Sequence, residues 1–169
     1  MILAALGANL SGPAGHPADQ IAAALEALDR RGIATLRRSR LWRSPAWPAP
    51  SDPPFVNAVA MLATELPPAA LLAEFHAVEA MLGRRRGRAN APRCIDIDLL
   101  DHGGRILPGR DGGVVLPHPR LAARAFVLLP LRDVAPDWRH PGTGQGLDLL
   151  IAALPPHAGT EPLDRQDEK

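Results

Sequence analysis

The segment from Pro92 to Leu100 constrains this chain most, because it places two carboxylates two residues apart in an apolar, β-branched stretch. Side chains at positions i and i+2 of a strand point to the same face, so Asp96 and Asp98 share one face while their apolar neighbours point into a core. Two neighbouring carboxylates repel each other unless a positive charge lies between them. Oxygen ligands of this kind suit Mg²⁺, which takes one or two protein carboxylates and completes its shell with water and phosphates. The pattern predicts a metal site, with solvated acids on an edge strand as the alternative.

An arginine-rich loop precedes this strand. Residues 83–93 hold five arginines in eleven positions, bounded by glycine and proline. Guanidinium groups bind phosphates in a bidentate way, so we expect Arg84 and Arg93, at the two ends of the loop, to converge on a polyphosphate. For Arg85 and Arg88 we expect solvated charges. Because nothing apolar anchors the loop, it is also a candidate for a lid that closes over a ligand.

Length and composition favour one globular domain. The chain has 169 residues, a net charge of +1 and a single cysteine, Cys94, so no internal disulfide can form. With so small a net charge, phosphate affinity must come from local arginine clusters. We predict one domain over residues 1–154 and a flexible tail over 155–169. No segment reaches the ~20 apolar residues of a membrane span and residues 1–6 make a poor signal peptide, so a cytoplasmic protein is expected.

The periodicity of apolar residues predicts the order strand, helix, two strands, helix, strand. The strands are expected at residues 2–6, 33–43, 55–64 and 92–100, and the helices at 19–30 and 67–82. This order is that of the ferredoxin-like α+β sandwich, in which both helices cover one sheet face and the other face is free for ligands. Extra C-terminal elements are predicted as a short hairpin within 106–116 and helices at 121–131 and 147–154.

Phe55 and Asn57 share a face of the strand at 55–64. A buried amide needs hydrogen-bond partners, and an aromatic ring two residues away offers a stacking surface, so the pair suits a flat heterocycle. Phe55 as plain core is the alternative. His118 lies in a Leu-Pro-His-Pro segment, with Arg124 and Phe126 six and eight residues later. In isolation, a loop histidine with satisfied hydrogen bonds is the favoured interpretation.

Four further residues have weaker signals. His76 and Glu79 share a flank of the second helix that points toward the arginine loop, and an ordinary surface pair is equally favoured. Cys94 is expected to be a small buried filler, since no base lies beside it. Asp101 has the opposite parity to Asp98, which predicts a place in solvent or a turn.

Taken together, these segments resemble the 6-hydroxymethyl-7,8-dihydropterin pyrophosphokinase family of folate biosynthesis. The resemblance spans residues 3–138. Its motifs are Leu6-Gly7-Ala8-Asn9-Leu10, Trp42-Arg43-Ser44-Pro45, Phe55-Val56-Asn57-Ala58, Glu79-Ala80-Met81-Leu82-Gly83-Arg84, Pro92 to Leu100, and Leu116 to Leu121 followed by Arg124-x-Phe126. In the acidic motif, Cys94 stands where the family has threonine.

This resemblance implies transfer of pyrophosphate from ATP to the hydroxymethyl group of 6-hydroxymethyl-7,8-dihydropterin, with release of AMP. By position, Asp96 and Asp98 would hold two Mg²⁺ ions and, with Arg84 and Arg93, form the catalytic set. The pterin would be bound by Ser44, Pro45, Phe55, Asn57 and Phe126. The nucleotide would be bound by His76, Glu79, Arg84, Arg93, His118 and Arg124. The expected partners are these two small molecules alone, with no nucleic acid, no membrane and a monomeric chain.

One departure from the family lies in the arginine loop. Many members have Arg-Trp-Gly before the Pro-Arg pair, whereas here the loop reads Arg88-Ala89-Asn90-Ala91 and is one residue shorter. The tryptophan that helps to seal the lid is therefore missing, which predicts weaker closure. Trp47, in the loop before the strand at 55–64, is the candidate that compensates for it.

Two other functions fit parts of the pattern. Ferredoxin-like sheets also carry RNA-binding modules, but only 4% of this chain is aromatic, it has no tyrosine, and it lacks a stacking motif for bases. An Asp-x-Asp pair also occurs in nucleotide-sugar transferases, but the nucleotide-binding α/β half of those enzymes is missing here.

Overall fold

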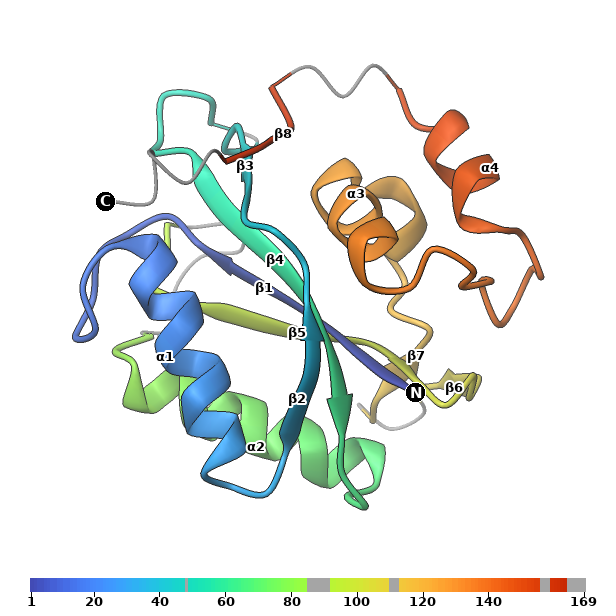
Figure 1. The fold of residues 1–169 in the computed structure, drawn as a ribbon, viewed down its shortest axis with the longest axis horizontal. Helices are drawn as coiled ribbons and strands as arrows, with labels where there is room; N and C mark the ends of the chain where they lie inside the picture. Colours follow the sequence, from blue (N-terminus) through green and yellow to red (C-terminus); the bar gives the residue numbers. More distant parts are fainter. Residues whose placement is uncertain (48, 85–91, 110–112, 156–158, 164–169) are drawn as a thin grey trace.

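The computed structural model describes residues 1–47, 49–84, 92–109, 113–155 and 159–163 (Figure 1). At its centre lies an antiparallel sheet in the order β5-β1-β4-β3-β8, with β2 also paired to β4. Strand β1 (Ile2–Ala8) runs between β4 (Phe55–Ala63) and β5 (Asp96–His102). The register pairs Gly7 with both Asn57 and Asp96, so this end of β1 joins the two strands that carry the predicted site residues.

Helices α1 (Pro17–Asp29) and α2 (Pro68–Met81) cover one face of the sheet (Figure 1). Their apolar residues recur at helical spacing and are buried, with Ile21 and Leu28 on α1 and Leu71, Phe75 and Val78 on α2. Ile95, Ile97 and Leu99 point into the same core, as the parity of the acidic strand predicted. The fold class predicted from the sequence is confirmed.

The opposite face is not free, contrary to the expectation from the sequence. Helices α3 (Ala125–Val134) and α4 (Leu147–Ala152) lie over part of it (Figure 1) and form a second core with Leu3, Val59 and Leu100. The open remainder of this face lies at the end of the sheet where Gly7, Asn57 and Asp96 meet.

The single strand predicted over residues 33–43 is instead two strands, β2 (Ala34–Arg38) and β3 (Trp42–Ser44), both paired with β4. Ser39 lies at the break. Its backbone N–H donates to the Val59 carbonyl at 2.9 Å, and its hydroxyl accepts a hydrogen bond from the Val59 N–H at 3.0 Å. Because a side chain replaces a backbone acceptor here, the strand stops and resumes three residues later.

The segment predicted as a helix over residues 121–131 begins differently. A 3₁₀ turn, Leu121–Ala123, precedes α3, and Arg124 between them is extended, with φ −119° and ψ 107°. The short hairpin is confirmed as β6 (Leu107–Pro108) and β7 (Val115–Leu116). The segment from β7 to α3 therefore crosses the end of the sheet as a turn, which brings Arg124 and Phe126 over the open face.

Two polar residues of this region differ from their predictions. Asp101 is only 2% exposed and accepts hydrogen bonds from Trp138 Nε1 and the Gly104 N–H, both at 2.8 Å. A bulge causes this reversal, because Leu3 pairs with Asp101 while Ala4 pairs with Leu99. Cys94 is half-buried rather than buried, and its thiol donates to the Ser11 carbonyl at 3.4 Å.

Part of the segment predicted as a flexible tail pairs with the sheet. Strand β8 (Glu161–Pro162) pairs with β3, and the Leu163 N–H donates to the Leu41 carbonyl at 2.8 Å. Leu163 also packs against the first core. Residues 156–158 and 164–169 of that segment lie outside the described residues.

Candidate active site

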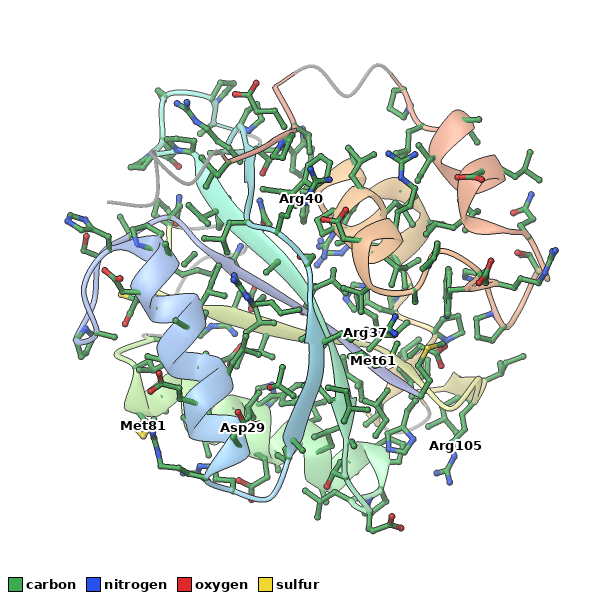
Figure 2. All side chains as sticks on the ribbon, in the orientation of Figure 1. Asp29, Arg37, Arg40, Met61, Met81 and Arg105 are labelled. Carbon is green, nitrogen blue, oxygen red and sulfur yellow. The ribbon has the colours of Figure 1, made fainter. Side chains whose placement is uncertain are left out.

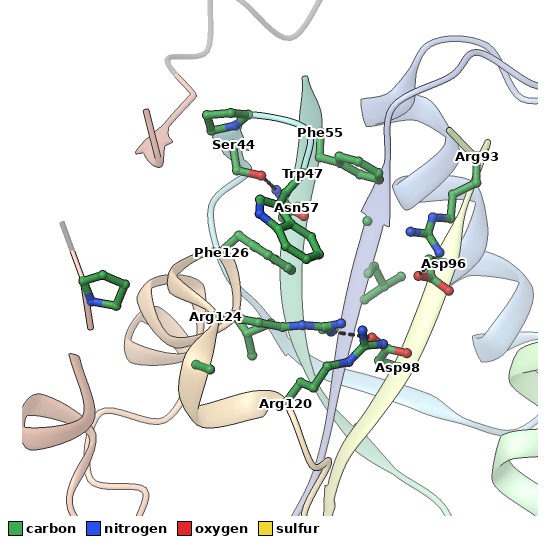
Figure 3. A pocket seen from close by; sticks show the side chains of 17 residues that line it. Ser44, Trp47, Phe55, Asn57, Arg93, Asp96, Asp98, Arg120, Arg124 and Phe126 are labelled. Atoms are coloured by element: carbon green, nitrogen blue, oxygen red, sulfur yellow. Dashed lines mark hydrogen bonds and ion pairs between the residues drawn. The ribbon is translucent and has the colours of Figure 1, made fainter. Parts of the chain in front are cut away.

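A cavity of about 530 Å³ opens over the uncovered part of the sheet (Figure 3). Its walls come from β1, β3, β4 and β5, from the loop before β4, and from residues 120–127. Nine residues assigned to a site from the sequence line it, namely Ser44, Pro45, Phe55, Asn57, Arg93, Asp96, Asp98, Arg124 and Phe126. The tertiary structure thus brings together residues up to about eighty positions apart.

One end of the cavity is aromatic. Figure 3 shows the rings of Phe55 and Phe126 on opposite sides of Asn57. Asn57 is 4% exposed, and its Nδ2 donates to Ser44 Oγ at 3.0 Å and to the Trp42 carbonyl at 3.4 Å. These bonds fix the amide and leave its oxygen toward Gly7, where a Cβ would lie 3.2 Å from Asn57 Oδ1. Glycine at this position therefore leaves room for the amide oxygen beside β1.

The other end is charged. Asp96 pairs with two arginines, since its Oδ1 lies 2.6 Å from Arg84 Nη1 and its Oδ2 lies 2.9 Å from Arg93 Nη1. These are the two arginines at the ends of the loop that the sequence analysis singled out. Residues 85–91 between them lie outside the described residues, and with them the predicted solvated charges Arg85 and Arg88 and the predicted lid.

Asp98 pairs with Arg124, whose Nη1 lies 3.0 Å from Asp98 Oδ2. His118 Nε2 lies 3.8 Å from the same oxygen. The Arg120 N–H donates to His118 Nδ1 at 3.2 Å, which leaves the proton of the neutral imidazole on Nε2, facing the carboxylate. Burial lowers the pKa of His118 below its ordinary 6.5, with Asp98 opposing this effect and Arg124 and Arg120 adding to it. His118 is therefore a neutral hydrogen-bond donor at pH 7.

Glu79 is buried, so the alternative of an ordinary surface pair with His76 is wrong for this residue. Its Oε1 accepts a hydrogen bond from the Ile97 N–H at 2.7 Å and a short one from Arg84. Burial raises the pKa of Glu79, and the bonds from Ile97 and Arg84 oppose that rise. Glu79 thus anchors Arg84 beside β5. His76 is exposed on α2 and does not line the cavity.

Two arginines connect the charged end with the aromatic end. The Arg93 guanidinium lies 5.7 Å from the centre of the Phe55 ring, and that of Arg124 lies 5.4 Å from the centre of the Phe126 ring. Each of these arginines also pairs with one aspartate. On each side of the cavity, a single arginine therefore contacts both an aspartate carboxylate and a phenylalanine ring.

The donor set fits a hard divalent cation. Among the described residues, no cluster of three or more His, Cys, Asp or Glu residues is arranged to hold a metal ion. A cation here would bind two carboxylates, Asp96 and Asp98, and take its other ligands from water and phosphate, which is the usual pattern for Mg²⁺. Arg93 Nε is buried without a hydrogen-bond partner in the described part of the chain, as expected for a group that binds an anion.

No role was predicted for two residues around the cavity, Arg120 and Asn9. Arg120 lines the cavity, and so does Trp47, which is 74% exposed and is the predicted substitute for the missing lid tryptophan. Asn9 is buried, and its Oδ1 accepts from the Arg93 N–H at 2.8 Å while its Nδ2 donates to the Pro53 carbonyl at 3.0 Å. An asparagine just past a strand is a signal for hydrogen bonds to neighbouring backbone. The partners of Asn9 could not be found from the sequence, because they lie 44 and 84 residues away.

An open sheet face with paired carboxylates and arginines at one end and aromatic rings at the other defines a class of enzyme. It suits a phosphotransferase whose acceptor is a flat heterocycle, because phosphoryl transfer needs alignment and charge neutralisation more than a covalent nucleophile.

Comparisons with known proteins agree with this class. Residues 3–136 match the family described as 7,8-dihydro-6-hydroxymethylpterin-pyrophosphokinase. The chain is 42% identical over 156 residues to a 2-amino-4-hydroxy-6-hydroxymethyldihydropteridine pyrophosphokinase of Pseudomonas aeruginosa, covering 91% of each chain. It is 41% identical over 133 residues to the Methylorubrum extorquens enzyme of that name, covering 78% of this chain and 80% of the relative.

Longer proteins also match. The chain is 37% identical to the folic acid synthesis protein fol1 of Pneumocystis carinii, of which it spans 20%. The crystal structure of wild-type Plasmodium falciparum HPPK-DHPS superposes with a TM-score of 0.66 at 14% identity, over 89% of this chain and 40% of that one. At this identity the superposition shows a shared fold.

The chain therefore belongs to the 7,8-dihydro-6-hydroxymethylpterin-pyrophosphokinase family. This confirms the family recognised from the sequence motifs, and with it the enzyme class, an ATP-dependent pyrophosphokinase of folate biosynthesis.

Proposed function

We propose that this chain transfers pyrophosphate from ATP to the hydroxymethyl group of 6-hydroxymethyl-7,8-dihydropterin, releases AMP, and uses the cavity over the open sheet face as its active site. The observation that carries the proposal is the union, in one cavity, of the Asp96 and Asp98 carboxylates with an aromatic pocket built around Asn57. Family membership supplies the reaction, and the geometry supports the assignment of residues to its parts.

The aromatic end is assigned to the pterin. Phe55 and Phe126 would stack on the two faces of the ring, and the Asn57 amide would hydrogen-bond its polar edge. Asn57 is suited to this because Ser44 already holds its Nδ2 in place, so little side-chain entropy is lost on binding. The backbone at Ser44 and Pro45 completes the wall.

The charged end is assigned to the phosphate chain of ATP. Arg84, Arg93 and Arg124 are each paired with a carboxylate, and we infer that they exchange this partner for phosphate oxygens when the nucleotide binds. His118 would add a neutral N–H donor, since its pKa is lowered by burial. Glu79 would keep Arg84 in position during this exchange, and His76 stays a predicted nucleotide contact.

Asp96 and Asp98 are assigned to Mg²⁺, with two ions predicted from the family resemblance. When bound, Mg²⁺ neutralises phosphate charge and polarises the bond that breaks. The residues of this chain align the pterin hydroxymethyl oxygen with the β-phosphorus of ATP, so that the new P–O bond forms as the bond to the α-phosphate oxygen breaks. AMP leaves with that oxygen, and the proton of the hydroxymethyl group is released to solvent.

The direct test is to incubate the chain with ATP, Mg²⁺ and hydroxymethyldihydropterin and to separate the nucleotide products. AMP is expected to form in step with pyrophosphorylated pterin. Asp96→Asn and Asp98→Asn variants should lose at least about 100-fold in kcat, as should the wild type in excess EDTA. Asp137→Asn, an exposed aspartate outside the cavity, is the matched control and should stay fully active. ADP as the main product would show that a different bond breaks.

No helix in the described residues is long and apolar enough to cross a membrane. A monomeric, cytoplasmic chain that binds neither membrane nor nucleic acid stays the prediction from the sequence.

A further inference from the structure

Arg120 differs from the other arginines around the cavity. Arg93 and Arg124 each contact a carboxylate and a ring, and Arg84 contacts two carboxylates. Arg120 lines the same cavity, yet no carboxylate of the described residues lies within ion-pair distance of its side chain. Figure 3 shows it reaching the Asp98 end of the cavity beside Arg124. It is therefore a guanidinium without a counter-ion at the place where an anion is expected.

The backbone that carries Arg120 is well held. Its N–H donates to His118 Nδ1 at 3.2 Å, and its carbonyl accepts from the Ala123 N–H at 3.3 Å at the start of the 3₁₀ turn. On either side, the His118 N–H donates to the Leu100 carbonyl at 2.9 Å, and Leu121 is fully buried. The side chain is thus presented from a fixed position rather than from the tip of a mobile loop.

The charges at this end do not balance. Among the described residues, Asp98 is the only carboxylate within ion-pair distance of Arg124 or His118, and it is already engaged by Arg124. The second guanidinium, that of Arg120, is close enough to add to the lowering of the His118 pKa. A surplus positive charge that faces an open cavity attracts anions, and a guanidinium binds a phosphate through two parallel hydrogen bonds.

We propose that Arg120 is a further phosphate-binding residue, which contacts the phosphate chain of ATP at the Asp98 end of the cavity. This inference rests on the proposed function and extends it. The paired arginines must leave a carboxylate before they bind phosphate, whereas Arg120 has no such pair to break. Arg120 therefore contributes to the capture of the nucleotide, in the ground state and the transition state alike, and so to KM more than to kcat.

The test compares Arg120→Ala and Arg120→Lys with Arg37→Ala, which removes the same charge from an exposed arginine of β2 that does not line the cavity (Figure 2). The probe is α,β-methylene-ATP with Mg²⁺, titrated by calorimetry. Arg120→Ala is expected to weaken its binding roughly tenfold, and Arg120→Lys to weaken it less, because lysine keeps the charge but not the bidentate geometry. Arg37→Ala should bind like the wild type.

Two further readouts separate phosphate binding from a structural role. Adenosine, which has no phosphate, should bind Arg120→Ala as it binds the wild type, and the KM for the pterin should be unchanged. The effect on α,β-methylene-ATP should shrink as salt rises from 50 to 500 mM, about a threefold change in Debye length. Equal affinity of Arg120→Ala and the wild type for this probe would overturn the assignment of Arg120 alone. A wild-type chain that forms no AMP would instead contradict the proposed function.

Discussion

At the scale of single residues, Arg93 and Arg124 are the points where the two ends of the site meet. Each guanidinium pairs with one aspartate and also lies over one of the two phenylalanine rings. In the proposed function, a change of partner from carboxylate to phosphate would alter the environment of the ring as well. This would give a physical route by which bound nucleotide changes the proposed pterin pocket without any movement of the sheet.

Trp47 lines the cavity although it is a large aromatic residue that is 74% exposed. This exposure calls for an explanation. If this side chain covers the pterin, Trp47→Ala should raise the KM for the pterin roughly tenfold and leave the KM for ATP unchanged, because only the pterin loses a stacking partner. Pterin should also quench the tryptophan fluorescence of the wild type. The buried Trp138 supplies a control, because Trp138→Phe should keep the quenching. Unchanged pterin affinity in Trp47→Ala would exclude the covering role.

At the scale of elements, Asn9 connects three parts of the site. It follows β1, receives the Arg93 N–H before β5, and donates to the Pro53 carbonyl in the loop before β4. Both partners are backbone groups, so the asparagine fixes the loop that carries the proposed pterin wall against the strand that carries the acids.

Asn9→Ala should therefore destabilise the chain by about 1–3 kcal/mol, because buried backbone groups are left without partners, and should raise the KM for both substrates. Asn9→Asp keeps the acceptor for the Arg93 N–H and should lose less. Urea unfolding and steady-state kinetics measure the two effects. A variant with lower stability but unchanged KM values would mean that Asn9 supports the fold and not the site.

A second contact between elements attaches α3 to the β2–β3 segment. Asp133 accepts a hydrogen bond from Trp42 Nε1 at 3.0 Å and forms an ion pair with Arg40 at 3.0 Å. Figure 2 shows Arg40 beside α3. Partial burial raises the pKa of Asp133, but the hydrogen bonds from Arg40 and Trp42 outweigh this and hold it below 3.8. The carboxylate thus stabilises the fold fully above pH 3.8, and this contribution disappears as the pH falls through the lower folded-state value.

Asp133→Ala should accordingly cost about 1 kcal/mol at pH 7, and the difference from the wild type should shrink toward zero in strong acid. Thermal or urea unfolding at several pH values measures it. Asp137→Ala, on an exposed aspartate nearby in sequence, should show no such dependence. A difference that persists undiminished well below pH 3 would assign the effect to packing and not to the ionised carboxylate.

At the scale of the whole molecule, the C-terminal segment closes the sheet beside the wall proposed to bind the pterin. Strand β8 pairs with β3, which carries Ser44, and Gly159 lies against Pro45, since a Cβ there would be 2.8 Å from the proline ring. Pro155 lines the cavity itself. The segment is thus tied to the site as well as to the sheet.

Removal of residues 155–169 should leave a folded chain that is less stable and has a raised KM for the pterin, because β3 loses its outer neighbour. Removal of residues 164–169 alone is the control and should change neither quantity. Kinetics with each substrate varied in turn, together with thermal unfolding, measure the outcome. An unchanged KM for the pterin in the longer truncation would show that β3 holds its position without β8.

The sequence by itself determined most of the elements, the family and most of the residues that meet in the cavity. Some patterns are local and can therefore be recognised in the sequence alone. Examples are the alternation at Asp96 and Asp98 and the helical spacing of Leu71, Phe75 and Val78. The ordered motifs added positions such as Ser44 and Phe126, which no periodicity distinguishes from ordinary strand and helix residues.

Only the tertiary structure decided features that depend on partners far apart in the chain. The bulge opposite Leu3 turned Asp101 inward, the Ser39 hydroxyl divided one predicted strand into two, and helices α3 and α4 covered part of a face expected to be free. It also decided that, among the described arginines around the cavity, Arg84, Arg93 and Arg124 pair with carboxylates whereas Arg120 does not. Ion pairs and hydrogen bonds across 80 residues are set by packing of whole elements, and a local pattern does not encode that packing.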